Sequence, residues 1–313
     1  MSTSTATPVP ARGILRRLYD RLPTDVRDRR LGLFAWLSAV AELLIIATGG
    51  AVRLTGSGLG CPTWPTCTAD SLVNTPEMGI HGVIEFGNRT LTGLVGILAI
   101  VVVVLVWRLR RQRRDLFVLA LVVLLGVVAQ AVVGGITVLT GLNPFIVGFH
   151  YVASVTLVAV TAAFLARRAA APGPRVRAVP KWYAILTHVT TLVLAVTIVF
   201  GVLTTGAGPH SGDAAAVRNG FDATVLEHVH AWPGYALLTL TLVLTASAWG
   251  LRLPVRRWMT GLLAVELVQI AVGLYQARNG LPELAVGVHM VLAAVTAAVM
   301  TVVVLNLKQA RRD

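Results

Sequence analysis

The chain has 313 residues, of which 56% are hydrophobic and only 13% are charged, with a formal net charge of +13. Average soluble domains are about 45–50% apolar and about 25% charged, so this composition excludes a soluble globular enzyme and indicates a membrane protein. The two cysteines allow at most one disulfide and cannot supply a four-thiolate metal site.

A helix that crosses a bilayer needs about 20 mostly apolar residues. Eight stretches meet this requirement, which predicts an all-α integral membrane protein with eight transmembrane helices. They cover roughly residues 32–52, 82–107, 116–140, 145–166, 182–204, 225–251, 258–276 and 283–307. The apolar run from Leu31 is longer than the core of a signal peptide, so we expect it to be the first span, after a polar tail over 1–31.

Lys and Arg residues fall almost entirely on one side of these spans. Of the 27 basic residues, the other side receives only four, namely Arg53, Arg89, Arg218 and Arg278. The positive-inside rule therefore predicts that the 1–31 tail and the 308–313 tail are both cytoplasmic. The positive charge is a topology signal, and no nucleic-acid partner is expected. Arginine greatly outnumbers lysine, which favours a bacterial source and hence the bacterial plasma membrane.

The two halves of the chain share motifs in the same order. The matching segments are 83–88 and 225–230, 129–130 and 268–269, 141–142 and 280–281, and 147–150 and 286–289. Each half contains an even number of spans, so the repeats would be related by an axis along the membrane normal. We therefore expect two tandem pseudo-symmetric four-helix bundles. They would cover residues 32–168 and 182–307.

Ionisable side chains inside a span are costly, which makes each one a candidate functional residue. His150, His230 and His289 each lie a few residues into a span that enters from the outer side, so we expect all three toward the outer leaflet. On facing helices, His230 and His289 would suit the two axial positions of a haem iron. Their recurrence at matched positions favours this interpretation over local hydrogen bonding, and zinc would need four ligands.

In the first half the matched pair is Asn88 and His150, so this site offers at most one imidazole at the matched positions. Glu85 lies one turn before Asn88 on the same helical face, and His81 lies on that face too. His81 would sit about 10 Å nearer the outer surface than Asn88. It could reach the edge or a propionate of a porphyrin, and an interfacial histidine in water is an equally good interpretation.

Cys61 and Cys67 lie in an outer loop, where the compartment permits disulfides. A structural disulfide is favoured over a redox-active pair, and a metal site comes third. The corresponding loop of the second half has no cysteine. The sequence predicts no role for Glu42, Glu266, His188, His210 or His228.

Taken together, these motifs resemble the haem A synthase family, over almost the whole chain from about residue 32. The resemblance is carried by residues 55–58, Cys61, 64–65, Cys67, 84–89, His150, His230 and His289. It implies eight helices in two pseudo-symmetric bundles, with a cofactor haem b held by His230 and His289. The substrate haem O would occupy the first bundle. That family commonly has histidine at the position of Asn88, so the departure here weakens the expectation of bis-histidine ligation for the substrate. The remaining pattern resembles an actinobacterial branch.

The reaction implied by the resemblance oxidises the C8 methyl of haem O to a formyl group and gives haem A for cytochrome oxidase. Glu85 would act as a base or stabilise positive charge at the reacting carbon. The implied partners are haem O synthase (protohaem farnesyltransferase) and the respiratory electron-acceptor pool, and a homo-oligomer is compatible with the pattern. The competing interpretations are a non-catalytic or quinol-oxidising b-type cytochrome and a transporter.

Overall fold

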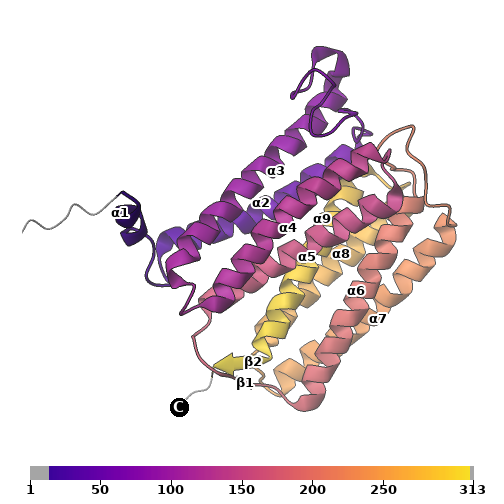
Figure 1. Cartoon of the computed structure of the whole chain (residues 1–313). Helices are drawn as coiled ribbons and strands as arrows, with labels where there is room; N and C mark the ends of the chain where they lie inside the picture. The colour runs from indigo at the N-terminus through magenta and orange to yellow at the C-terminus, as the bar shows by residue number, and fades with distance from the viewer. Residues whose placement is uncertain (1–13, 311–313) are drawn as a thin grey trace, which may run out of the picture.

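The computed structural model describes residues 14–310, and its dominant feature is a set of eight long helices (Figure 1). These are α2 (Arg29–Leu54), α3 (Gly79–Val106), α4 (Arg114–Leu139), α5 (Pro144–Ala169), α6 (Lys181–Ala207), α7 (Ala223–Gly250), α8 (Arg256–Arg278) and α9 (Glu283–Asn306). Each is long and apolar enough to cross a membrane. The eight predicted spans are confirmed, and the protein is an all-α integral membrane protein that crosses the bilayer several times.

The remaining elements are short. They are α1 (Ile14–Asp20), the 3-10 helices η1 (Pro76–Met78) and η2 (Trp107–Leu109), and the strands β1 (Arg175–Arg177) and β2 (Lys308–Ala310). The two strands pair antiparallel and tie the α5–α6 loop to the residues after α9. This ribbon was not predicted, because strands of three residues leave no recognisable pattern in a sequence. Of the predicted tails, residues 1–13 and 311–313 lie outside the described residues.

Local signals explain where several spans begin. The Asp28 side chain accepts a hydrogen bond from the backbone N–H of Arg30 at the start of α2. The Arg30 guanidinium also donates to this carboxylate, which lowers the pKa of Asp28. Asn143 caps α5 in the same way, and Pro144 follows at the first helical position, where its missing N–H costs nothing. Asp222 caps α7. These caps satisfy backbone donors that lack a partner within their own helix.

The helices pack in pairs that follow the chain. Sequence neighbours contact each other in the series α2 to α5 and again in the series α6 to α9. The two series meet mainly along α5 and α9, with further contacts between α2 and α9 and between α5 and α6. Many large apolar side chains, including Trp36, Leu125 and Leu192, are exposed on the outside. In a bilayer these side chains would face lipid, so their exposure is expected.

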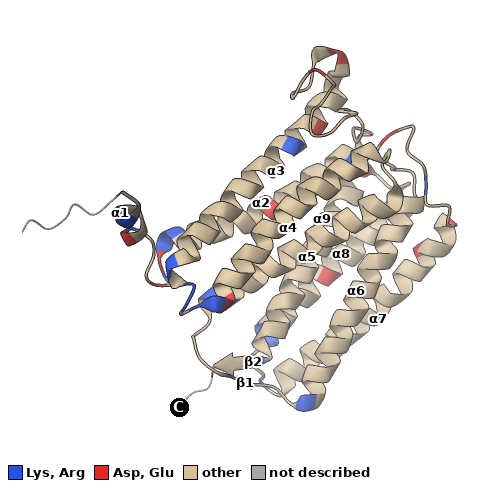
Figure 2. Cartoon of the chain, viewed as in Figure 1, with Lys and Arg blue, Asp and Glu red and all other residues tan. Residues whose placement is uncertain are grey.

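Lys and Arg residues are concentrated at one end of the long helices (Figure 2). Lys and Arg residues gather where α2 begins, in the α3–α4 connection, at the β1–β2 ribbon and in the α7–α8 turn. We call this the basic end. The opposite end carries the loop with Cys61 and Cys67, and we call it the cysteine-loop end.

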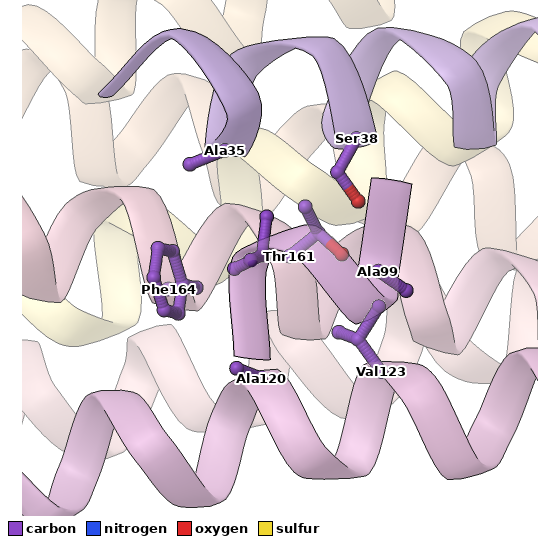
Figure 3. A pocket seen from close by; sticks show the side chains of 8 residues that line it. Ala35, Ser38, Ala99, Ala120, Val123, Thr161 and Phe164 are labelled. Atoms are coloured by element: carbon purple, nitrogen blue, oxygen red, sulfur yellow. The ribbon is translucent and has the colours of Figure 1, made fainter. Parts of the chain in front are cut away.

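The interior of the first helical series is closely packed toward the basic end. A cavity of about 10 Å³ lies there between α2, α3, α4 and α5 (Figure 3). Its only polar lining residues are Ser38 and Thr161. This volume matches about one water molecule. The four helices are therefore closely packed around this cavity.

Candidate functional site

His230 on α7 and His289 on α9 face each other. Their ring centroids are 6.2 Å apart and their ring planes are nearly perpendicular, at 83°. His230 Nδ1 lies 3.0 Å from the backbone oxygen of Thr197 on α6. When Nδ1–H donates to a carbonyl, Nε2 keeps the lone pair that binds a metal. The predicted pairing of these two histidines is thus possible in geometry as well as in sequence position.

Two glycines make room for these rings. A Cβ added at Gly201 on α6 would lie 2.8 Å from Cε1 of His230, and one added at Gly273 on α8 would lie 3.0 Å from Cε1 of His289. Both distances are shorter than ordinary contacts, so each imidazole lies in a space that a side chain would fill. The backbone oxygen of His289 accepts a 3.0 Å hydrogen bond from Gln269 on α8. Each ring is therefore held by the neighbouring helix.

The donor set fits a haem better than a closed metal site. Among the described residues, no group of three or more His, Cys, Asp or Glu side chains could hold a metal ion. His289 Nδ1 is a buried atom with no hydrogen-bond partner in the described part of the chain. Two opposed imidazoles supply two axial ligands, which is what a haem iron takes from a protein and half of what structural zinc requires.

The first helical series repeats this arrangement with one changed residue. His150 on α5 lies over Gly134 of α4, with its Cε1 3.4 Å from the position of a Cβ there. Gln130 on α4 donates a 2.7 Å hydrogen bond to the backbone oxygen of His150, as Gln269 does for His289. On the other side, the amide of Asn88 on α3 lies over Gly49 of α2.

Matching turns set the positions of His150 and His289. Both Gly141-Leu142 and Gly280-Leu281 have positive φ angles at both residues, between 58° and 71°. The Leu142 N–H donates to Thr137 O at 2.8 Å, and the Leu281 N–H donates to Gln276 O at 2.9 Å. Leucine rarely adopts this left-handed conformation, so its use twice in equivalent turns is a specific feature. Each histidine follows its leucine by eight residues and so enters its helix at the same height.

Glu85 is buried on α3 and is fully hydrogen-bonded. One carboxylate oxygen accepts from the Cys61 backbone N–H at 2.7 Å, and the other forms an ion pair with Arg89 one turn further along α3. Arg89 also donates to the backbone oxygens of Cys61, Thr63 and Thr66. Arg89 was not among the residues predicted to form the site. The spacing of four residues between Glu85 and Arg89 was the signal that could have found this pair.

The loop between α2 and α3 contains the Cys61–Cys67 disulfide, which confirms the favoured prediction for the two cysteines. Both cysteines are fully buried. The Trp64 ring packs on Gly135 of α4, next to the glycine that faces His150. Gly60 lies directly against the backbone of His81, where a side chain could not fit. The loop therefore covers the cysteine-loop end of the first series.

His81 lies at the start of α3 and is exposed. Its Nδ1 is 2.9 Å from the hydroxyl of Ser57, which is fully buried. His81 lines an open pocket of about 640 Å³ that also contacts the α6–α7 loop through Asp213 and Ala214. This location near the surface agrees with the expectation that His81 lies well away from the level of Asn88.

Two further carboxyl groups are buried within spans. Glu42 on α2 accepts a 2.9 Å hydrogen bond from Thr161 on α5, and Glu266 on α8 accepts a 3.0 Å bond from Thr241 on α7. Each has one carboxyl oxygen with no partner among the described residues. Both acids link neighbouring helices of one series, which gives them a packing role that the sequence did not predict.

The sequence of the chain matches a known family and several known proteins. Residues 32–301 match the family described as cytochrome oxidase assembly protein. A heme A synthase of Lysinibacillus sphaericus is 32% identical over 141 residues, 44% of each chain. The heme A synthase of Alkalihalophilus pseudofirmus is 26% identical over 199 residues, 62% of this chain and 64% of its own. The heme A synthase of Geobacillus kaustophilus is 29% identical over 141 residues, 44% of this chain and 43% of its own.

In each of these three matches the chain covers less than two thirds of the relative's length. The family match is broader, since it runs from the start of α2 almost to the end of α9 and includes every candidate site residue described above. The chain belongs to the haem A synthase family of cytochrome oxidase assembly proteins.

Proposed function

We propose that this protein is a haem A synthase, which oxidises the C8 methyl group of haem O to a formyl group and so produces haem A. The observation that carries the proposal is the pair of matched sites. One has two facing imidazoles, and the other has a single imidazole at His150 with Asn88 opposite in register and a buried Glu85–Arg89 ion pair nearby. The family match over residues 32–301 supports it further.

In this proposal the chain consists of two functional bundles. Residues 32–168 form the substrate bundle and residues 182–307 form the cofactor bundle. The matched Gly–His contacts, the matched Gln–His hydrogen bonds and the matched Gly-Leu turns support the division. The assignment to an actinobacterial branch stays a prediction.

The cofactor bundle would hold haem b through His230 and His289. A haem with two imidazole ligands exchanges single electrons and has no free position for a substrate. The chain's part is to fix both rings, through Thr197 O for His230 and through the space beside Gly201 and Gly273. This haem would carry electrons away from the substrate bundle toward the respiratory electron-acceptor pool.

In the substrate bundle His150 would hold the iron of haem O, and Glu85 would act at the edge of the macrocycle. Arg89 pairs with the Glu85 carboxylate and the Cys61 N–H donates to it, and both interactions favour its charged form. We therefore favour stabilisation of positive charge at the reacting carbon over a role as general base. His81, near the surface, would contact at most a propionate.

The proposed orientation places the basic end in the cytoplasm and the cysteine-loop end outside, as the positive-inside rule requires. Both haem sites then lie toward the outer leaflet of a bacterial plasma membrane. Haem O synthase, which would supply the substrate, is the expected functional partner, and a homo-oligomer remains compatible with the exposed helical faces.

Pigment analysis in a host that makes haem O but lacks its own haem A synthase tests the function. Membranes with this chain should contain haem A, and membranes with the empty vector should contain only haems B and O. The His289→Leu variant should also form no haem A. If the purified parent carries haem b and the membranes contain no haem A, the protein is a b-type cytochrome and the proposal is wrong.

A further inference from the structure

Asn88 occupies the position on α3 that His230 occupies on α7, as the matching segments 83–88 and 225–230 indicate. Both amide atoms of Asn88 lie 4.0 Å from the position of a Cβ on Gly49, whereas the corresponding distance from Gly201 to His230 is 2.8 Å. The shorter side chain therefore leaves more space beside α2 than His230 leaves beside α6. It is also partly buried and not on the outer surface.

Thr48 on α2 determines how this amide is turned. The Thr48 hydroxyl donates to Asn88 Oδ1 at 2.7 Å, which is shorter than its distances to the backbone oxygens of Leu44 at 3.1 Å and Ile45 at 3.4 Å. Among the residues that the structure describes, Asn88 Nδ2 has no hydrogen-bond partner. An amide nitrogen carries two N–H donors and is not a metal ligand of the imidazole type. Asn88 thus offers hydrogen-bond donation at the position where His230 offers a ligand.

His150 on α5 occupies the position in the first series that His289 occupies on α9. It lies over Gly134 with its Nε2 3.7 Å from the position of a Cβ there, and its Nδ1 is a buried atom without a partner in the described chain. In the second series the residues at these two positions face each other at 6.2 Å between ring centroids. Asn88 and His150 occupy the matching positions in the sequence of the first series, so that series has a single imidazole and an amide donor at these two positions.

We propose that Asn88 Nδ2 donates a hydrogen bond to a small exogenous ligand, an anion or a diatomic molecule, on the iron of the haem held by His150. The inference rests on the proposed function, because it requires a haem in the first bundle. Donors on the side opposite the protein ligand control whether a haem binds and retains such ligands. The first bundle is then an open site, and the second is closed by two imidazoles.

Cyanide binding to the ferric, haem-loaded protein tests this inference. The second-bundle haem has both axial positions filled, so only the first-bundle haem should respond. Asn88→Leu keeps a similar side-chain volume and removes the donor, so cyanide should bind about tenfold more weakly, as expected for a lost hydrogen bond to a charged ligand. Asn88→Gln retains an N–H donor and should lose less. Thr48→Val frees the amide to rotate and should give a smaller loss in the same direction.

Carbon monoxide bound to the ferrous protein gives a second readout, since a donor near the bound oxygen lowers the C–O stretching frequency. The frequency should be higher in Asn88→Leu than in the parent, with the haem content of the two proteins equal. Equal cyanide affinity or equal stretching frequency in the two proteins would overturn the inference. So would haem A formation by a parent protein that has no cyanide-responsive haem. Cyanide binding that depends on Asn88, in a protein that makes no haem A, would instead contradict the proposed function alone.

Discussion

The two helical series have similar helix contacts but carry different side chains at one matched position. In the second, His230 and His289 face each other, and each ring is pressed against a glycine of the adjacent helix. In the first, His150 keeps this arrangement, but Asn88 replaces the second imidazole and a buried Glu85–Arg89 pair lies one turn away. The two series therefore share a pattern of helix and glycine contacts and differ at one matched position, where His230 corresponds to Asn88.

The largest effect is expected from removing a ligand of the second series. His230→Leu or His289→Leu should abolish the low-spin bis-imidazole spectrum and most haem b content, because each variant leaves a single imidazole of the facing pair. Absorption spectra and haem extraction of the purified variants measure this. The variants should still insert and fold, since a leucine side chain fills much of the space beside Gly201 or Gly273 and the apolar surfaces of α7 and α9 are unchanged. An unchanged spectrum in both variants would refute the assignment.

Glu85 and Glu227 lie at matched positions, and we expect only Glu85 to be needed for haem A formation. Glu85 is buried and paired with Arg89, whereas Glu227, its counterpart on α7, is exposed. Glu85→Gln should reduce haem A formation at least tenfold and leave haem b in place, and Glu227→Gln should have no effect on either. The assay is the haem A content of membranes at equal protein level. Parental activity in Glu85→Gln would make Glu85 purely structural.

Arg89→Gln should lower stability as well as activity. It leaves the Glu85 carboxylate and three loop carbonyl oxygens without their donor, which costs on the order of 1–3 kcal/mol. Thermal unfolding in detergent should show the loss. The matched position on α7 is Ala231, so Ala231→Gln serves as a control that adds an amide where no carboxylate is buried.

Gly201 lies beside His230 and Gly49 lies beside Asn88, and alanine at these two glycines should have different effects. Gly201→Ala would place a methyl group 2.8 Å from the His230 ring and should shift or weaken the haem b spectrum. Gly49→Ala would place it 4.0 Å from the Asn88 amide, an ordinary contact, and should leave the first site intact. Visible spectra of the two variants, recorded at equal protein concentration, compare the effects. Equal perturbation by both substitutions would contradict the packing described here.

The smallest effect is expected from the disulfide, which only the first series has. Cys61→Ser together with Cys67→Ser should lower the unfolding free energy by about 2 kcal/mol, the chain-entropy value for so short a loop. The haem b spectrum should not change, because residues 60–64 of the loop pack on α3 and α4, and the loop meets the second series through the Gly58–Gly212 backbone hydrogen bond and not through His230 or His289. Thiol labelling of the parent before and after reduction checks that the bond is present.

Much of the fold could be predicted because the solvent is a bilayer. Apolar runs of about 20 residues mark the spans. The helices α2 and α5 begin directly after the caps Asp28 and Asn143, residue types that are visible in the sequence. The matched histidines could be found for a similar reason, since polar residues inside such runs stand out. These signals depend on local sequence alone.

Contacts between helices could not be predicted in this way. That Gly201 faces His230, or that Glu42 reaches Thr161, depends on how each helix is rotated about its axis. Hydrophobic periodicity normally reports that rotation, but in a bilayer both the lipid-facing and the inward-facing sides are apolar. The hydrogen bond from the Cys61 N–H to Glu85 could not be predicted either, because the folding of the Cys61–Cys67 loop onto α3 leaves no periodic signal.

Electron paramagnetic resonance of the ferric protein loaded with haem O and haem b tests the central claim most directly, namely that the two series hold haem with different ligand sets. We expect one low-spin signal that disappears in His289→Leu and one high-spin signal that disappears in His150→Ala. Asn88→His should convert the high-spin signal into a second low-spin signal. Two low-spin signals in the parent protein would contradict the account, because Asn88 would then not be the residue that separates the two sites.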